Sequence, residues 1–309
     1  MRLLVTGGAG FIGANFVHRA VARGDEVTVY DALTYAGNPA NLAGLDGRSG
    51  YRFVHADVCD ASTLSMVHFA AESHVDRSLV EPDRFVTTNC GGTATVCRVA
   101  MEVGVGRVLH VSTDEVYGSI GEGSFVEGDP LAPSSPYSAS KASSDLIALS
   151  YHETFGLPVV VTRSSNNYGR FQFPEKVIPL FVTRLLAGGR VPLYGDGGNV
   201  RDWCHVEDNC AALERVLADG EVGTVYNVGA GAEVDNLDLT RRLLDLCGAD
   251  ESAVQYVADR PGHDRRYSVD TTRIRSLGWA PSRGLDEGLA ETVAWYRDHQ
   301  DWWEPLLGD

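Results

Sequence analysis

The stretch VTGGAGFIGAN, residues 5–15, decides the fold of this chain. It carries Gly7, Gly10 and Gly13 in the spacing G-x-x-G-x-x-G, directly after the apolar run RLLVT and at the start of an amphipathic stretch. Glycines in such a turn let the chain reverse sharply and let its main chain approach a pyrophosphate, which the N–H groups at a helix N-terminus can bind. The stretch therefore predicts a strand, a phosphate-binding turn and a helix over about residues 10–23.

The first half of the chain repeats this alternation of short apolar runs and longer amphipathic stretches. The further apolar runs are EVTVYD, YRFVHAD, MVHFAA, RVLHVS and PVVVTR, and helices are expected over residues 83–102 and 136–155. Strands that alternate with helices indicate a parallel sheet. We therefore predict an α/β fold, a Rossmann-type doubly wound parallel sheet with a smaller C-terminal substrate-binding sub-domain. The first domain is expected over residues 1–165, with a later strand near 223–229 returning to it, and the second mainly over residues 166–309.

One connection in the first half is unusually short. The strand YRFVHAD ends near Asp57 and the strand MVHFAA begins near Met66, so only residues 58–65 lie between them. A parallel crossover normally needs a dozen or more residues. Two explanations stay open, a very short crossover or a segment missing from the chain, and the second is favoured.

The composition narrows the classes of ligand. The 309 residues are 44% hydrophobic and carry a formal net charge of −16, which argues against nucleic acid and acidic membrane surfaces as partners. The sequence has no basic, apolar leader and no apolar run of about 18 residues, so a cytoplasmic protein outside the membrane is expected. The six cysteines match no zinc-ligand spacing, and no metal is predicted.

The ends of the second and third strands point to the kind of dinucleotide. Asp31 lies 18 residues after Gly13, where a carboxylate can accept both hydroxyl groups of an adenosine ribose. An aspartate at this position would repel the 2′-phosphate of NADP, so the sequence favours NAD. Asp57 and Val58, at the end of the next strand, are expected beside the adenine ring.

A second group of residues has the chemistry of an active site. Tyr137 and Lys141 are four residues apart, so they share a face of a helix, and Ser135 and Pro136 suit the start of that helix. A nearby ammonium lowers the pKa of a phenol, which would make Tyr137 a usable base for a sugar or alcohol hydroxyl. Thr113, at the end of an earlier strand, can hydrogen-bond the same oxygen.

The neighbouring carboxylates Asp114 and Glu115 raise a geometric question. A regular strand points neighbouring side chains to opposite faces, so both can enter one cleft only if the strand ends at or before Thr113. Two close carboxylates also raise the pKa of one of them, which favours a protonated Asp114 beside an ionised Glu115. The pair is therefore predicted to be an acid and a base that act on one substrate.

These motifs together resemble a known family. The glycine turn, STDEVYG (residues 112–118) and SPYSASK (residues 135–141) stand in the order and spacing of the extended branch of the short-chain dehydrogenase/reductase superfamily. The stretches HFAAESHVDRS, NNYGRFQFPEKVIPLF, LYGDGGNVRDW and DRPGHDRRYSVD are similar to those of the dTDP-glucose 4,6-dehydratases, and the resemblance runs from residue 2 to about residue 296. Two positions depart from it, because Asn209 stands where the family usually has His and Ser164 where Cys is frequent.

The resemblance implies a hydro-lyase reaction with catalytic NAD. Tyr137 would remove the 4-hydroxyl proton of dTDP-glucose while NAD takes the C4 hydride, Glu115 would then take the C5 proton, and Asp114 would protonate the departing C6 hydroxyl. Return of the hydride to C6 would give dTDP-4-keto-6-deoxyglucose and water. A nucleotide-sugar 4-epimerase or decarboxylase, a dehydratase of another nucleotide sugar, and a catalytically idle NAD-dependent sensor stay as alternatives. The acid–base pair argues against an epimerase, which needs none at C5 and C6.

The resemblance also assigns the remaining site residues. The catalytic set is Thr113, Asp114, Glu115, Tyr137 and Lys141. The NAD contacts are Gly7, Gly10, Phe11, Ile12, Gly13, Asp31, Ala32, Leu33, Thr34, Asp57, Val58, Phe69, Ala70, Ala71, Ser73, Thr88, Tyr137, Lys141 and Asn167. The nucleotide-sugar contacts are Ser73, Thr113, Asn166, Lys176, Val177, Pro192, Leu193, Tyr194, Arg201, Asn236, Asp259, Arg260, Pro261, Gly262 and His263. A homodimer through a four-helix interface, formed by the helices at 83–102 and 136–155, is implied as well, whereas the pathway served is not readable.

Overall fold

The computed structural model describes residues 1–59 and 67–307. Its larger part is a seven-stranded sheet in the order β10-β6-β5-β4-β1-β2-β3, in which every neighbouring pair is parallel. The strands are β1 (Arg2–Thr6), β2 (Glu26–Asp31), β3 (Tyr51–His55), β4 (Val67–His68), β5 (Val108–Thr113), β6 (Val159–Ser164) and β10 (Val225–Val228). The predicted Rossmann-type parallel sheet is confirmed, and the strand order reverses between β1 and β4, where such sheets bind ligands.

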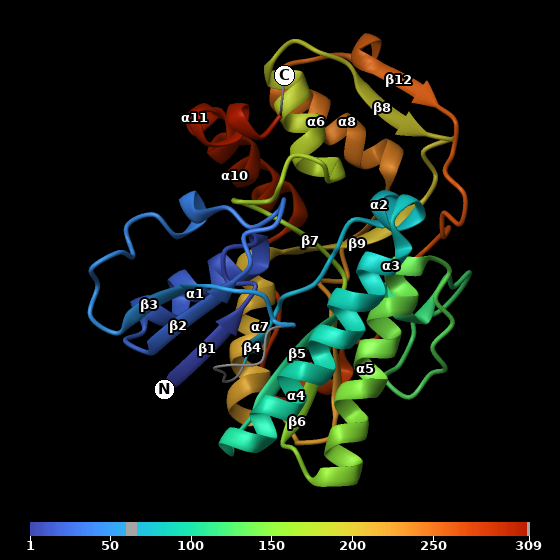
Figure 1. Ribbon diagram of the computed structural model, residues 1–309. Coiled ribbons are helices and arrows are strands. Elements are labelled where there is room, and N and C mark those ends of the chain that lie inside the picture. The colour runs from blue at the N-terminus through green and yellow to red at the C-terminus, as the bar shows by residue number, and fades with distance from the viewer. Residues whose placement is uncertain (60–66, 308–309) are drawn as a thin grey trace.

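Helices cover both faces of this sheet (Figure 1). The helices α1 (Phe11–Ala22) and α7 (Val206–Asp219) share one hydrophobic core, to which Val160 of β6 contributes. The helices α4 (Gly92–Val103) and α5 (Pro136–Phe155) share another, to which the neighbouring Val159 and Val161 contribute. Because successive side chains of a strand point to opposite faces, β6 is apolar on both sides, as expected of a buried parallel strand.

The C-terminal part forms a smaller lobe above the carboxyl ends of the large sheet (Figure 1). It holds a sheet of β11 (Glu233–Asp235), β9 (Val200–His205) and β7 (Asn166–Tyr168), and a parallel pair of β12 (Val254–Val257) and β8 (Val191–Tyr194). Its longer helices are α6 (Val177–Leu186), α8 (Asn236–Cys247) and α10 (Leu285–Asp298), which pack around one core. The remaining short helices are η1 (Pro39–Leu42), α2 (Val75–Val80), α9 (Thr272–Ser276), η4 (Glu251–Ala253), α11 (Gln300–Trp303) and η5 (Glu304–Leu306).

The chain crosses between the two lobes more than once. The strand β10 lies beside β6 in the large sheet, within the range 223–229 where a returning strand was expected. The helix α7, which the sequence did not single out, packs against α1. Residues 206–228 therefore belong to the large sheet and its layers, although they follow residue 165.

The helix expected over residues 83–102 is interrupted. The chain forms α3 (Pro82–Phe85), a π-helical stretch Val86–Gly91 and then α4. The wide turn contains the buried Asn89, whose side chain accepts from Glu72 N at 2.8 Å and donates to Glu72 O at 3.1 Å. A π-helical turn at such a position is typical of functional sites, and this one ties the helix to the segment after β4.

The short crossover predicted at residues 58–65 falls mostly on residues 60–66, which lie outside the described residues. That a segment is missing from this crossover therefore stays a prediction.

Candidate active site

The glycine turn between β1 and α1 forms one wall of the site. Gly7 has a φ of +69°, and a Cβ on it would lie 2.6 Å from Ala70 N. A Cβ on Gly13 would lie 2.2 Å from Gly7 O. Gly10 precedes the first residue of α1 without a side-chain cap, so the first N–H groups of the helix stay available for an anion. The turn thus has the close backbone approach and the donors that a pyrophosphate needs.

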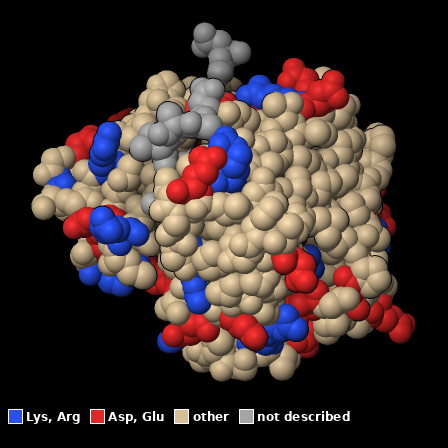
Figure 2. Space-filling model, turned by 60° about the horizontal axis from the view of Figure 1, so that its bottom comes forward, with Lys and Arg blue, Asp and Glu red and all other residues tan. Residues whose placement is uncertain are grey.

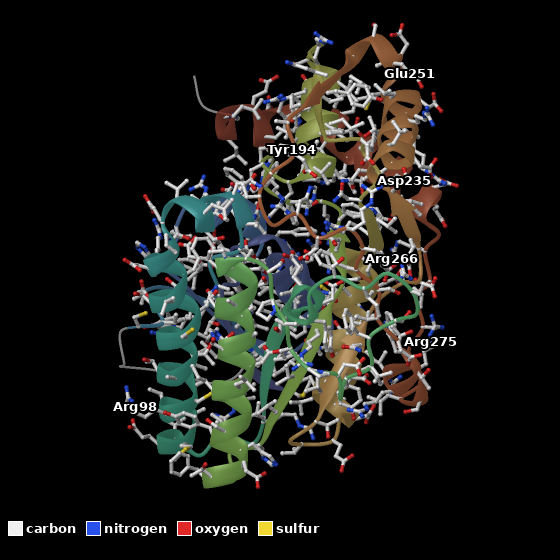
Figure 3. All side chains as sticks on the ribbon, turned by 90° about the vertical axis from the view of Figure 1, so that its right-hand side faces the viewer. Arg98, Tyr194, Asp235, Glu251, Arg266 and Arg275 are labelled. Carbon is white, nitrogen blue, oxygen red and sulfur yellow. The ribbon has the colours of Figure 1, made fainter. Side chains whose placement is uncertain are left out.

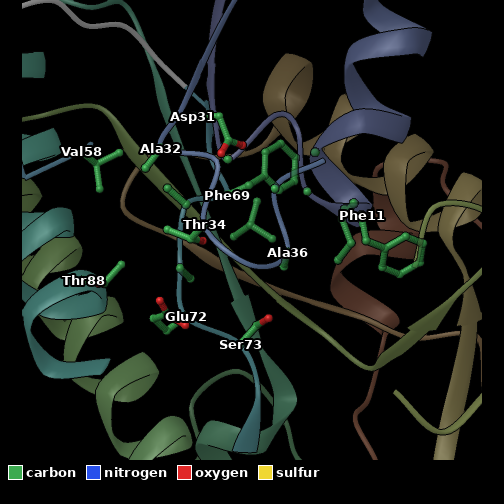
Figure 4. A pocket seen from close by; sticks show the side chains of 18 of the residues that line it. Phe11, Asp31, Ala32, Thr34, Ala36, Val58, Phe69, Glu72, Ser73 and Thr88 are labelled. Atoms are coloured by element: carbon green, nitrogen blue, oxygen red, sulfur yellow. The ribbon is translucent and has the colours of Figure 1, made fainter. Parts of the chain in front are cut away.

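A cavity of about 570 Å³ opens beside this turn, at the carboxyl ends of the central strands. Figure 4 shows Asp31, Ala32 and Thr34 toward one end of it, and Glu72 and Ser73 toward the other. The predicted NAD contacts that line it are Gly7, Gly10, Phe11, Ile12, Gly13, Asp31, Ala32, Thr34, Asp57, Val58, Phe69, Ala70, Ala71, Ser73, Thr88, Tyr137 and Lys141. Leu33 and Asn167 are not among the lining residues.

Asp31 stands at the end of β2 and is fixed by the main chain on both sides. Its Oδ2 accepts from Ala9 N at 2.8 Å and its Oδ1 from Leu33 N at 2.8 Å. Burial raises the pKa of this carboxyl group, and the two N–H donors oppose the rise. A carboxylate held in this way beside a glycine cradle fits the adenosine ribose of NAD, because each oxygen keeps a lone pair for a hydroxyl group.

The strand β5 ends at Thr113, as predicted. A 3₁₀ helix over Asp114–Tyr117 follows, and its Glu115 N donates to Thr113 Oγ1 at 3.3 Å. The Thr113 hydroxyl donates to Asp114 Oδ1 at 3.3 Å. The turn releases Asp114 and Glu115 from the alternation of a strand, and both carboxylates act electrostatically on Tyr137, although neither of them lines the cavity.

Asp114 and Glu115 have different electrostatic surroundings. Burial raises the pKa of Asp114 well above its usual range, and the negative charges of Glu115 and Asp202 raise it further. Burial also raises the pKa of Glu115, but Lys176, Arg201 and Arg260 oppose that rise. Two titratable groups whose surroundings separate their pKa values are suited to different roles, here Asp114 as the acid and Glu115 as the base.

The helix α5 presents Tyr137 and Lys141 to the cavity. Ser135 and Ser138 cap its N-terminus reciprocally, and Pro136 occupies the first turn. Tyr137 and Lys141 line the cavity on the same helix face, one turn apart. Lys141 Nζ donates to Val111 O at 2.8 Å, which fixes the position of the ammonium.

The protonation of this pair differs from the expectation. Burial raises the pKa of Tyr137 well above 10, the carboxylates of Glu115 and Asp114 raise it further, and the Thr113 hydroxyl opposes the rise. Burial lowers the pKa of Lys141 to about 8, against the attraction of Asp145. The predicted lowering of the phenol pKa is therefore not found, because burial and the two carboxylates raise this pKa and Lys141 is not among its main influences.

Basic side chains gather on the other side of Glu115. Lys176 Nζ donates to Ser73 O at 2.6 Å, and Arg260 Nη1 lies 3.1 Å from Asp76 Oδ1. Arg201 is 5% exposed, donates to Asp264 O at 2.9 Å and stacks 4.1 Å above the Tyr267 ring. These cations come from three separate segments and could hold a diphosphate next to the base.

The other predicted nucleotide-sugar residues lie in the C-terminal lobe, outside the lining of the cavity. Tyr194 contacts His263 edge-to-face at 6.2 Å, and His263 Nδ1 lies 2.6 Å from Asp259 Oδ1. Tyr194 is 37% exposed (Figure 3), whereas Leu193 is 2% exposed on the opposite face of β8. The remaining members are Asn166 in β7, Val177 and Asn236 at the starts of α6 and α8, Pro192 in β8, and Pro261 and Gly262 in the loop before residue 263.

Two acids that line the cavity were not predicted. Glu72 is 4% exposed, and its Oε1 lies 2.7 Å from Arg84 Nε. Burial raises the pKa of Glu175, which lies between Arg77 and His74. Glu72 stands inside the motif HFAAESHVDRS between two residues that were predicted, so the motif itself could have revealed it.

The two positions that depart from the family pattern contact each other. Ser164 Oγ donates to Asn209 Oδ1 at 2.8 Å, and both residues are buried. The two departures therefore form one local pair that satisfies the serine hydroxyl.

Neither a metal centre nor a membrane helix is found within residues 1–59 and 67–307. No group of three or more His, Cys, Asp or Glu side chains there could hold a metal ion. None of the described helices is both long enough and apolar enough to span a bilayer.

Comparison with known proteins agrees with this geometry. Residues 4–292 match the family model for GDP-mannose 4,6 dehydratase. The chain is similar to a dTDP-glucose 4,6-dehydratase of Streptomyces griseus, 55% identical over 317 residues that cover 99% of this chain and 97% of that protein. The aligned length exceeds the 309 residues of this chain by eight, so the relative has residues without a counterpart here.

Solved structures are similar over nearly the whole length. The structure of DesIV, a dTDP-glucose 4,6-dehydratase from Streptomyces venezuelae with NAD and TYD bound, is 56% identical with a TM-score of 0.97, covering 99% of this chain and 100% of that one. A UDP-glucose 4-epimerase from Thermus thermophilus in complex with NAD is 32% identical with a TM-score of 0.90, covering 97% and 100%. The sheet and the dinucleotide turn are thus common to enzymes of different reactions, and the site residues must distinguish them.

Proposed function

The chain belongs to the dTDP-glucose 4,6-dehydratase family, and from that premise we propose that it is a hydro-lyase that converts dTDP-glucose to dTDP-4-keto-6-deoxyglucose and water. The cofactor is NAD, for which the glycine turn and Asp31 provide the binding groups. When bound in the cavity, NAD supplies reversible acceptance of a hydride, taken from C4 of the sugar and given back at C6.

Three residues prepare C4 for loss of its hydride. Tyr137 would accept the proton of the 4-hydroxyl group in its ionised form, and the Thr113 hydroxyl, which hydrogen-bonds Tyr137, opposes the rise of its pKa. Lys141, anchored on Val111 O at 2.8 Å, brings a positive charge to the same helix face one turn further along. A protonated Asp114 removes one of the two negative charges that raise the pKa of Tyr137. Protonation of Asp114 therefore makes the Tyr137 phenol easier to ionise.

The carboxylate pair then carries out the elimination. The ketone at C4 makes the C5 proton acidic, and the ionised Glu115 takes it. Asp114, whose pKa is raised by burial and by Glu115, gives its proton to the departing C6 hydroxyl. Water would leave with the proton from Asp114, and Glu115 would give the proton it took back to C5.

The observation that carries this proposal is the turn after Thr113, which brings Asp114 and Glu115, in different electrostatic surroundings, near Tyr137. An epimerase inverts C4 and needs no acid–base pair at C5 and C6, so this pair favours dehydration. The nucleotide is anchored by Lys176, Arg201 and Arg260 in the proposal, and thymidine follows from the family.

The decisive experiment incubates the purified protein with dTDP-glucose and, separately, with UDP-, GDP- and CDP-glucose. A 4-keto-6-deoxy sugar absorbs in alkali, and we expect this signal to be strongest with dTDP-glucose. Recovery of the C4 epimer, or no turnover of any nucleotide sugar, would contradict the proposed reaction. Asp208→Asn, which changes a buried carboxylate outside the site, is the control for variants of the two site carboxylates.

We also propose that the protein is a homodimer through α4 and α5. Figure 2 shows a broad face with few charged side chains. The exposed positions 139, 143, 146 and 150 of α5 follow a helical stripe without a charge. Leu146 is 60%, Phe155 60%, Val86 55% and Met101 38% exposed, and these exposed apolar side chains together with the uncharged stripe favour burial against a second copy.

A charge on this face tests the dimer. We expect Leu146→Glu to shift the protein toward the monomer in analytical ultracentrifugation, since the glutamate would be buried without a partner. Leu307→Glu, at a leucine that is 45% exposed elsewhere, should leave the sedimentation coefficient unchanged. Equal behaviour of the two variants would contradict the interface. The cytoplasmic location stays a prediction from the sequence.

A further inference from the structure

A line of hydrogen bonds connects the C-terminal helix α11 with the glycine turn. Trp302 Nε1 donates to Asn41 Oδ1 at 2.9 Å, and Asn41 Nδ2 donates to Ala9 O at 2.8 Å. Ala9 lies between Gly8 and Gly10, and its N–H donates to Asp31 Oδ2 at 2.8 Å. Residue 302 is thus two side-chain contacts away from the turn that faces the pyrophosphate.

The Ala9 peptide groups are held from outside the cavity. The Ala9 carbonyl accepts from Asn41 Nδ2 and also from Asn38 N at 3.1 Å. Neither Asn41 nor Trp302 lines the cavity, so both act on the cofactor only through the main chain. A carbonyl oxygen that turned toward a bound pyrophosphate would repel it, whereas the first N–H groups of α1 attract it.

Asn41 has little freedom to adopt another arrangement. It is 1% exposed, its carbonyl accepts from His18 Nε2 at 2.7 Å, and its N–H donates to Asn38 O at 3.0 Å. If the Trp302 N–H were absent, the Asn41 Oδ1 would lose its donor in a buried place, which costs more than the bond contributed. Rotation of the amide to find another partner would remove the Asn41 donor and leave Ala9 O with Asn38 N alone.

Trp302 is itself placed by an aromatic cluster. Its ring lies 5.0 Å from that of Trp295 and 6.2 Å from that of Phe171. Phe171 has a φ of +69°, an unusual backbone for a bulky residue, which shows that its surroundings hold it firmly. Figure 1 shows α10 and α11 close to the blue segment after β2, which contains η1.

The C-terminal helices reach the cavity border at a second point. The hydroxyl of Tyr296 in α10 donates to Gln172 O, and Gln172 lines the cavity. The aromatic cluster therefore contacts both the segment at residues 39–42 and the segment at residues 171–173.

We propose that Asn41 is a positioning residue for the dinucleotide and that Trp302 holds its amide in the orientation that fixes the Ala9 carbonyl. The C-terminal helix α11 thereby sets how well the glycine turn is formed before the cofactor enters. The inference rests on the proposed function only in that the cavity takes a dinucleotide.

The test compares two tryptophans of one helix. Trp302→Phe keeps the aromatic packing and removes the N–H that Asn41 accepts. Trp303→Phe is the matched control, because Trp303 is 2% exposed and its Nε1 donates to Tyr296 O at 2.7 Å, away from the turn. We expect Trp302→Phe to weaken NAD binding to the nucleotide-free protein by about threefold to tenfold, the loss typical of one hydrogen bond, and Trp303→Phe to leave it unchanged.

A substitution at Asn41 sharpens the comparison. In Asn41→Asp the side chain still accepts from Trp302 but cannot donate to Ala9 O, so NAD binding should weaken by at least the same factor. Addition of Trp302→Phe to Asn41→Asp should then cost less than it does alone, since both changes act on one contact. Amide hydrogen exchange at residues 9–13 should rise in Trp302→Phe and stay unchanged in Trp303→Phe.

The outcomes separate this inference from the proposed reaction. Equal NAD dissociation constants for Trp302→Phe, Trp303→Phe and the unchanged protein would overturn the inference, whatever the sugar turnover. If the protein binds NAD and shows the expected difference but dehydrates no nucleotide sugar, the inference stands and the reaction is wrong. Absence of NAD binding in the unchanged protein would overturn both.

Discussion

The two anion-binding parts of the cleft are built in opposite ways. The dinucleotide turn is one contiguous stretch, residues 7–13, whose glycines and helix N-terminus present main-chain N–H groups. The nucleotide-sugar side instead collects the side chains of Lys176, Arg201 and Arg260 from segments far apart in the sequence. The first part is a shape of the backbone, and the second is a set of side-chain charges that are each anchored by contacts of their own.

The difference suits the tasks of the two parts. A cofactor that stays through the cycle needs a fixed cradle, and the turn is held by Asp31 and Asn41 before anything binds. The cations on the other side, which hold a diphosphate in the proposed function, also oppose the rise in the pKa of Glu115. The dinucleotide turn fixes the geometry of its site, and the cations on the other side also influence the protonation of Glu115.

Among changes in the dinucleotide turn, Gly13→Ala is expected to weaken NAD binding the most. The new Cβ would lie 2.2 Å from Gly7 O, so the main chain of the turn would have to move. We expect NAD affinity to fall by about tenfold to a hundredfold, as overpacking of a rigid contact does, while the affinity for dTDP changes little. Gly106→Ala, where a Cβ meets nothing within 4 Å, is the matched control for calorimetric titration. Equal loss of NAD and dTDP binding in Gly13→Ala would contradict the separation of the two halves.

A smaller effect is expected from Lys176→Gln on the other side. Lys176 is the foremost cation opposing the rise of the Glu115 pKa, so its removal raises that pKa. Because the base must be ionised, the acid limb of the pH profile of kcat should move to higher pH, by about one unit. The KM for the nucleotide sugar should rise by about tenfold, as for a lost charge-assisted contact.

The control for this change is Arg265→Gln. Arg265 forms an exposed pair with Asp196 and is not among the cations that act most on Glu115. Its variant should keep the pH profile of the unchanged protein. An acid limb that stays in place in Lys176→Gln would show that this lysine binds substrate without influencing the base.

What could be predicted from the sequence follows the same division. The strand, the glycine turn, the end of β5 at Thr113 and the Tyr137–Lys141 spacing depend on neighbours within a few residues, and the structure places them as expected. The π-helical turn at Val86–Gly91 was missed because it is imposed by Asn89 and the main chain of a distant segment. The link from Trp302 to Ala9 spans nearly the whole chain and has no local pattern.

Protonation was the other quantity beyond reach of the sequence. The spacing of Tyr137 and Lys141 indicated a lowered phenol pKa, but burial and two carboxylates raise it. The prediction for Asp114 was closer, because adjacency to Glu115 is visible in the sequence, whereas the contribution of Asp202 is not. Burial and long-range charge decide such values, and both are properties of the folded chain.

The central claim is that Glu115 and Asp114 act only after Tyr137 has allowed oxidation at C4. Its most direct test is a single-turnover reaction of the Glu115→Gln variant with dTDP-glucose, monitored through the absorbance of reduced nicotinamide. Loss of the C5 base should lower overall turnover by about a hundredfold to ten-thousandfold, and the reduced cofactor should accumulate, since oxidation still occurs and elimination does not. Full turnover, or no reduction of the cofactor at all, would contradict the assignment of Glu115 as the C5 base.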